Sequence, residues 1–270
     1  TLNKTSATIV KGLTEQLVAT VQPPNATNQA IAWSSSDNGV ASVSATGLVT
    51  GVNAGTAAIT VTSADQGLTA SCSVTVLPEG QTPQLKVGNK WTYELTDNGT
   101  YYTVVYEITG EGTVNGEDCW VMLMSWAPDF MGLNSMTSRM SKATLFDLQG
   151  QFSMTIAGYT ASASVVCSYS PSNASPFPLE VGKQFSVTAT ETTTVMVLGE
   201  TTTETETTAN TYKVEAVEQV TVQAGTFKCF KITDTTNAGV STSWYSDQAK
   251  LWVKTVGYDG STMELKSYSL

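Results

Sequence analysis

The sequence predicts an all-β protein, in which a β-sandwich precedes an internally duplicated antiparallel β domain that closes as a barrel, a half-barrel or a two-sheet sandwich. Three observations support this fold class. Charged residues make up only 13% of the 270 residues, and the threonine- and valine-rich runs between them favour strands over helices. Short alternating apolar segments, separated by turn residues, fill the first 77 residues. Three sequence blocks then recur in the same order further along the chain.

The first domain is expected to span residues 1–77. In “SCSVTV”, Cys72, Val74 and Val76 share one strand face, which therefore points into a core. Trp33, in “AIAWSSSD”, is expected to be a large core side chain between two sheets, in preference to a ligand-stacking residue.

Four stretches of this domain resemble the bacterial immunoglobulin-like domain of group 2, the type found in intimin- and invasin-like surface proteins. They are “LNKTSATIVKG” at 2–12, “LVATVQPPNAT” at 17–27, “IAWSSSDNGVASVSATGLVTGVNAGTAAITVT” at 31–62 and “CSVTV” at 72–76. The resemblance implies a spacer or an adhesive module outside the cell. Since a fold alone does not define a function, the spacer role is the simpler expectation.

A linker and a duplicated domain are expected to follow. Residues 78–84, within “LPEGQTPQ”, combine proline, glycine and polar residues, as exposed linkers do. In the domain at 85–270, “LKVGNKWT” recurs as “LEVGKQFS”, “YEITGEGTVNGEDCWVML” as “YKVEAVEQVTVQAGTFKCFKI”, and “TSRMSKATLF” as “TSWYSDQAKLW”. Three blocks in register predict two copies of one β unit, at 85–170 and 178–270, that share one core.

The second copy carries a further resemblance. Its segments “VQAGTFKCFKI” and “WYSDQAKLWVKTVGYDGSTMEL” are similar to uncharacterised exported bacterial lipoproteins whose domains resemble the half-barrels of periplasmic lipoprotein carriers. This resemblance implies a curved antiparallel sheet with an apolar concavity.

The best candidate for a functional site is an apolar insertion in the first copy. “SWAPDFMGLNSM” stands where the second copy has the polar “TDTTNAGVS”. We interpret it as a loop that forms either a lid over a ligand cavity or an exposed contact patch. The alternative is that it plugs one end of the barrel as part of the core. The candidate ligand-binding residues are Trp126, Phe130, Met131, Leu133 and Met136.

The four cysteines are Cys72, Cys119, Cys167 and Cys229. Cys119 and Cys229 occupy equivalent positions in the two copies, so a disulfide between them is one alternative and two free buried thiols are the other. Cys72 and Cys167 follow apolar alternation and are expected to be small buried hydrophobic residues. No Cys-x-x-Cys spacing is present, so a metal or redox site of that kind is excluded.

Composition excludes several classes of function. The net charge of −10 leaves few cations to neutralise phosphates, so nucleic acid is not an expected partner. Histidine is absent, which excludes histidine-based triads and metal sites. No metal, cofactor or catalytic residue is predicted. The acidic “TTTETETT” at 201–208 is expected to be a solvated strand or hairpin, because a calcium site needs six or more converging oxygens. No pair of acidic residues in the sequence marks the active site of a glycosidase.

We therefore expect a non-enzymatic, exported protein of the bacterial cell surface, the extracellular space or the periplasm. In the preferred hypothesis, an Ig-like spacer presents a β domain that binds a protein or a glycan. The alternative is a carrier or receptor for a lipid or another apolar small molecule, with a cavity of roughly 300 Å³ or more beneath Trp126–Met136. No run of apolar residues is long enough to span a membrane, and a lipid anchor upstream of Thr1 stays compatible with the sequence.

Overall fold

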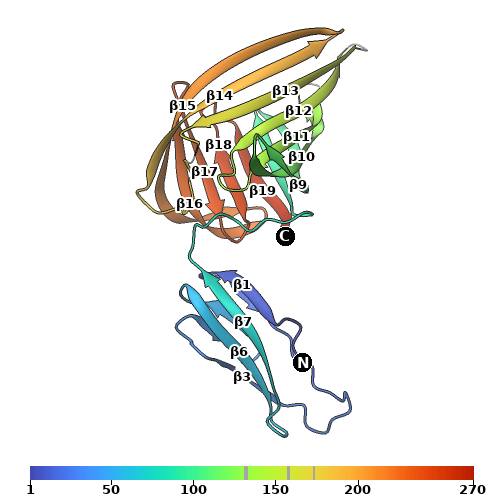
Figure 1. The fold of residues 1–270 in the computed structure, drawn as a ribbon, viewed down its shortest axis with the longest axis vertical. Helices are drawn as coiled ribbons and strands as arrows, with labels where there is room; N and C mark the ends of the chain where they lie inside the picture. Colours follow the sequence, from blue (N-terminus) through green and yellow to red (C-terminus); the bar gives the residue numbers. More distant parts are fainter. Residues whose placement is uncertain (131–132, 157–158, 173) are drawn as a thin grey trace. The chain divides into compact units, whose positions relative to one another are not determined.

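The computed structural model describes residues 1–130, 133–156, 159–172 and 174–270, and it divides the chain into two units. The first unit spans Thr1–Gln81 and the second spans Thr82–Leu270. Both consist of strands joined by turns, and Figure 1 shows the small first unit in blue to cyan and the larger second unit in green to red. The all-β fold class is confirmed.

The first unit is a sandwich of two sheets, one in the order β1-β7-β6-β3 and one in the order β2-β5-β4. Its core contains Cys72, Val74 and Val76 on one face of β7, as their alternation predicts. Trp33 packs against this core but remains half-buried. The strands are β1 Ser6–Val10, β2 Thr14–Gln16, β3 Ile31–Ser35, β4 Ala41–Val43, β5 Leu48–Gly51, β6 Gly55–Ser63 and β7 Thr69–Leu77.

The second unit is a closed barrel in which each strand pairs with the next strand along the chain, and β19 pairs with β8 to close the ring. Every neighbouring pair is antiparallel, so the barrel is a simple meander. Its strands are β8 Lys90–Asp97, β9 Thr100–Val114, β10 Glu117–Phe130, β11 Leu133–Ser141, β12 Asp147–Ile156, β13 Tyr159–Ser170, β14 Gln184–Val197, β15 Glu200–Val222, β16 Gly225–Thr235, β17 Val240–Ser246, β18 Leu251–Val256 and β19 Thr262–Ser269.

The same local geometry recurs in β8–β13 and in β14–β19. In each half a glycine at φ 90° precedes the first strand, and two backbone hydrogen bonds tie that turn to the second strand. These bonds are Gly88 N to Ile108 O and Ile108 N to Asn89 O in one half, and Gly182 N to Val214 O and Val214 N to Lys183 O in the other, all at 2.8–2.9 Å. In both halves the ladder shifts register directly after this point, at Thr109 and at Glu215. These correspondences support our proposal that residues 85–170 and 178–270 arose by duplication.

The main core of the barrel is built from both halves. Trp91 and Tyr93 of β8 are fully buried beside Leu251 and Val253 of β18. The Trp91 indole N–H donates to the carbonyl of Ala249 at 2.7 Å, and the Tyr93 hydroxyl donates to the carbonyl of Trp252 at 3.0 Å. Because these contacts join the first half to the second, neither half encloses this core alone.

Candidate functional site

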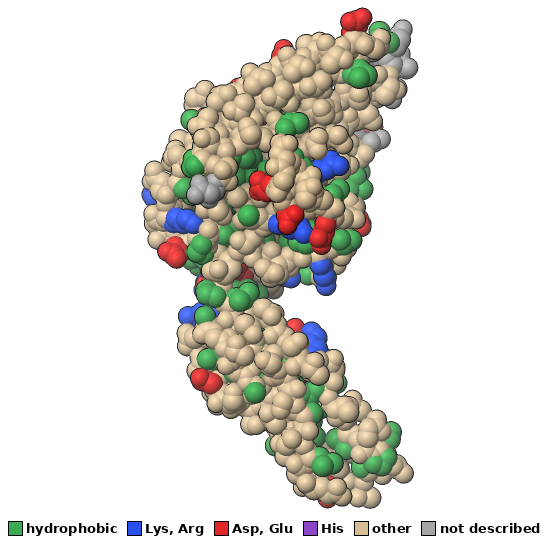
Figure 2. Space-filling view, viewed as in Figure 1, with side chains coloured by type: hydrophobic (Ala, Val, Ile, Leu, Met, Phe, Trp, Pro, Cys, Tyr) green, Lys and Arg blue, Asp and Glu red, His purple; other side chains and the backbone are tan. Residues whose placement is uncertain are grey.

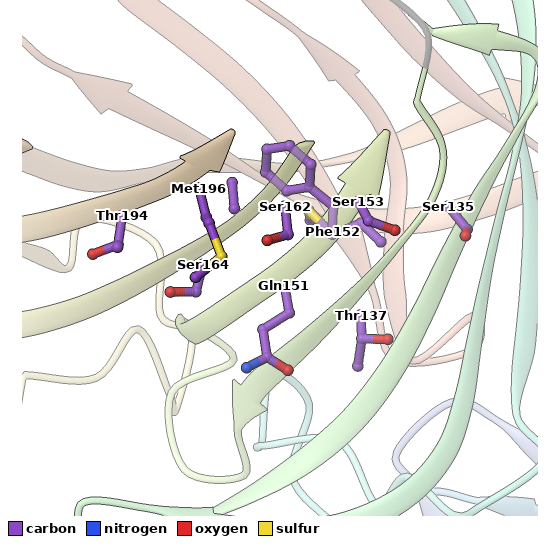
Figure 3. Close-up of a pocket in the computed structure, with 11 residues that line it drawn as sticks. Ser135, Thr137, Gln151, Phe152, Ser153, Ser162, Ser164, Thr194 and Met196 are labelled. Carbon is purple, nitrogen blue, oxygen red and sulfur yellow. The ribbon is translucent and has the colours of Figure 1, made fainter. Parts of the chain in front are cut away.

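A hollow of about 440 Å³ lies across β11, β12, β13 and β14 of the barrel. Two cross-strand rows of side chains form it, and Figure 3 shows them as sticks. One row consists of Thr137, Gln151, Ser164 and Thr194, and the other of Ser135, Ser153, Ser162 and Met196. Met136, Phe152 and Ala163 lie between these rows in sequence and complete the lining.

The hollow forms because the side chains at its centre are small. Ser153, Ser162 and Ser164 sit on the two middle strands, whereas the longer Gln151 and Met196 stand beside them. Successive side chains of a strand point to opposite faces, and Figure 3 shows the Phe152 ring directed away from Gln151. The two polar rows therefore share one face of these strands, whereas Met136, Phe152 and Ala163, which also line the hollow, belong to the opposite face.

The lining is uncharged and mixes polar with apolar side chains, since Met136, Phe152, Ala163 and Met196 stand among its hydroxyl groups. It presents six hydroxyl groups and one amide, and it includes no acidic or basic residue. In the part of the chain that the structure describes, no hydrogen bond engages the side chains of Gln151, Ser162 or Ser164. Hydroxyl and amide groups both donate and accept, so this surface suits a neutral ligand that is itself rich in hydroxyl or amide groups.

The apolar segment singled out from the sequence is not a loop. Trp126 lies within β10 and Met136 within β11, and these two strands form a hairpin in which Phe130 pairs with Leu133. The expectation of a loop is wrong because β10 pairs with β9 as far as Ala127, and the β10–β11 ladder, after a register shift, ends with Phe130 opposite Leu133. Met131 and the Phe130 side chain lie outside the described residues.

Two of the five candidate residues pack against the main core. Trp126 and Met136 are half-buried and contact the core cluster that contains Met122 and Met124. These contacts favour the plug alternative for this segment. Of the candidate side chains that the structure describes, Met136 is the one that also lines the hollow. A ligand-binding role for the five residues remains a prediction.

The cysteines are all free thiols. Cys119 lies on β10 and Cys229 on β16, which are not neighbours in the barrel, so a bridge between them does not form. Both side chains are fully buried. Burial raises the pKa of the Cys119 thiol, and it raises the pKa of the Cys229 thiol to about 12. Neither thiol is therefore poised as a nucleophile.

The inward face of the barrel carries several polar groups among its apolar residues. The Ser138 hydroxyl donates to the Asp147 carboxylate, and the Asn210 amide donates to the Tyr212 hydroxyl at 3.3 Å. Tyr212 pairs across the ladder with Asp234, whose carboxyl pKa is raised by burial. A purely apolar lining, which the carrier alternative implies, is therefore interrupted at these positions.

The described ranges contain neither a metal-binding cluster nor a membrane-spanning helix. There, no group of three or more acidic or cysteine side chains is arranged to hold a metal ion. No helix of sufficient length and hydrophobicity to span a bilayer occurs in the same residues. The acidic segment 201–208 is part of the strand β15, and a strand was one of the two structures expected for it.

The hollow was not among the sites predicted from the sequence. Its only local signal is the alternation of serine with small apolar residues in “YTASASVV”, which predicts a strand but not a pocket. The hollow depends on the register of four strands, and single-strand patterns do not contain that information.

Comparison with known proteins agrees with the division of the chain. A family model for the bacterial Ig-like domain of group 2 matches residues 1–74. Residues 1–74 are a bacterial Ig-like domain of group 2. The resemblance seen in the sequence is thereby confirmed, and this Ig-like domain corresponds to the sandwich. A second model, described as DUF3108-like, matches residues 170–268 of the barrel.

Curated relatives share a segment of the length of the Ig-like domain. The chain is 48% identical over 71 residues to an alpha-L-arabinofuranosidase of Bifidobacterium longum, covering 26% of this chain and 7% of that protein. It is 47% identical over 73 residues to a lacto-N-biosidase of Bifidobacterium bifidum, covering 27% and 6%. It is 46% identical over 77 residues to an Ig-like virion protein of Serratia phage KSP90, covering 28% of this chain and 30% of that protein. The chain thus spans less than a third of each relative.

Solved structures with low similarity include exported proteins. One, from Bacteroides fragilis, is described as an exported protein with a YmcC-like fold; it has 13% identity and a TM-score of 0.39, covering 71% of this chain and all of that chain. The lipoprotein YmcC of Escherichia coli has 11% identity and a TM-score of 0.35, covering 70% of this chain and 91% of that chain.

Proposed function

We propose that the chain is an exported surface protein in which the Ig-like domain acts as a spacer and the barrel binds a neutral glycan in the hollow across β11–β14. The observation that carries the proposal is the lining of six hydroxyls and one amide without a charge. Two relatives that share the Ig-like segment are named as enzymes that act on carbohydrates, which gives this ligand class a context.

The chemistry of the hollow matches a sugar more closely than a lipid. A lipid chain gains affinity from burial of apolar area, whereas the exposed side chains here are mainly serine, threonine and glutamine. Each sugar hydroxyl both donates and accepts, so it pairs with serine, threonine and amide groups in any orientation. The exposed Met196, at one edge of the hollow, offers an apolar contact for the C–H face of a sugar ring.

Binding of a panel of neutral oligosaccharides to the full chain, measured by isothermal titration calorimetry, tests this proposal. Ser162→Phe fills the centre of the hollow and should abolish binding of any sugar that the wild type recognises. Thr188→Phe is the matched control and should bind the sugar normally. Thr188 lies on the same face of β14 as Thr194 and Met196 but outside the hollow. Failure of every neutral oligosaccharide to bind, or equal binding by both variants, would refute the glycan proposal.

An apolar-ligand carrier is the second candidate, and one row of the inward face favours it. Met124, Met136, Phe152, Ala163 and Val195 follow one another across β10–β14 in register, which gives a continuous apolar stripe. Native mass spectrometry of freshly purified protein decides between the candidates. A co-purifying lipid would support the carrier, whereas ligand-free protein that binds a sugar would support the glycan site.

A further inference from the structure

The strand β15 has one free edge over nearly half of its length. Residues 211–222 of β15 pair with β16, but residues 200–210 pair only with β14. In the described part of the chain no strand lies on the other side of residues 200–210. This segment spans about 35 Å, and in Figure 1 β14 and β15 form the long uppermost pair of strands. We call residues 200–210 the open edge.

The open edge belongs to a well-paired hairpin rather than to a loose segment. Fourteen consecutive residue pairs join β14 to β15 in unbroken register. On one face, threonine hydroxyls of the two strands lie 3.1–3.4 Å apart in the pairs Thr190–Thr207, Thr192–Thr205 and Thr194–Thr203. A paired hairpin with an unpaired edge offers its outer N–H and C=O groups in the geometry that an added strand requires.

The other face of the hairpin is acidic. Glu206 lies directly opposite Glu191 of β14, and Glu204 is the next residue of β15 on that face. Like charges directly opposite each other destabilise a ladder. Among the ion pairs of the described residues, none involves these three glutamates. Their arrangement therefore favours a cationic neighbour.

Two buried oxygens without a donor lie at the foot of the open edge. They are Oδ1 of Asn210, the last residue of the open edge, and Oδ1 of Asp234, near the end of β16. Asp234 pairs with Tyr212 in the ladder, so both oxygens lie where β16 stops covering β15. Both oxygens therefore leave hydrogen-bonding capacity unused directly beside the open edge.

A second copy of this chain fits the open edge poorly. Symmetric antiparallel pairing of two open edges about Thr205 would place Glu204 of one copy opposite Glu206 of the other. The charge pattern therefore disfavours self-association, and it selects a partner of opposite charge.

We propose that the open edge binds an extended polypeptide segment bearing lysine or arginine at alternate positions, which adds as an antiparallel strand in line with β16. Its backbone would pair with residues 200–210, and its basic side chains would face Glu191, Glu204 and Glu206. This partner is a protein, and its site is separate from the sugar-binding hollow of the proposed function.

The test uses the full chain and a fluorescent eleven-residue peptide in which lysine alternates with threonine. Fluorescence anisotropy should show binding that weakens as salt is added, and hydrogen exchange should show new protection of the amides within residues 200–210. Two peptides serve as controls, one with glutamine in place of lysine and one with alternate backbone amides N-methylated. Both should bind weakly, since the first lacks the charge and the second lacks half of the backbone donors.

Protein variants give an independent check. Glu204→Gln with Glu206→Gln should weaken binding of the lysine peptide about 2- to 30-fold. The matched pair Asp65→Asn with Glu180→Gln removes the same charge elsewhere and should leave the affinity unchanged. The proposal is overturned if the lysine peptide does not bind, if the N-methylated peptide binds equally well, or if protection appears outside β15.

Discussion

Replacement of Trp126 by alanine separates the two roles considered for the β10–β11 hairpin. Trp126 is half-buried and packs against the main core of the barrel. Full removal of a buried tryptophan costs about 3–5 kcal/mol, so a half-buried one should cost about 1.5–2.5 kcal/mol. For a unit of this size each kcal/mol lowers Tm by about 2–4 °C. The barrel should therefore melt about 3–10 °C lower.

Differential scanning calorimetry measures this change, with the Ig-like domain as an internal reference that should not shift. Tyr101→Ala is a suitable control, because Tyr101 is 64% exposed and its loss should change stability by less than about 0.5 kcal/mol. An unchanged Tm for the Trp126 variant, together with lost ligand binding, would contradict the packing argument and support a lid.

Three further predictions follow from individual residues. Gly47→Ala should destabilise only the Ig-like domain, by at least about 2 kcal/mol, because φ is +82° and the new Cβ would lie 2.6 Å from the carbonyl oxygen of Leu17; calorimetry should then show the barrel transition in place. Burial raises the pKa of the Asp234 carboxyl group in the native state above its ordinary value of 3.8, so ionisation of this group disfavours the native state. The free energy of unfolding should therefore fall as the pH rises from about 3.8, the pKa expected in the unfolded chain, through the raised native pKa. Asp234→Asn should remove this part of the slope in urea unfolding at a series of pH values, and an identical slope would contradict the assignment. Iodoacetamide should label neither Cys119 nor Cys229 in native protein and all four cysteines after unfolding without reductant, whereas a thiol blocked in unfolded protein would indicate a disulfide.

The strand positions and the Ig-like domain were predictable because their signals are local. Alternation in “SCSVTV” places Cys72, Val74 and Val76 on one face, and all three are buried in the structure. The same reasoning failed between Trp126 and Met136. Pro128 and Gly132 suggested a loop there, but pairing with neighbouring strands overrode these weak local preferences.

The sequence by itself predicted that the chain is all-β, that residues 1–77 form an Ig-like domain, and that related blocks recur in the second domain. The first two follow from patterns within short segments, and the third follows from comparing such segments with one another. Only the tertiary structure decided how twelve strands close, that Cys119 and Cys229 stay apart, where the serine-lined hollow forms and which part of β15 remains unpaired. The physical reason is that these features depend on strand order and register, which are set by long-range pairing between segments and not by the pattern within any one of them.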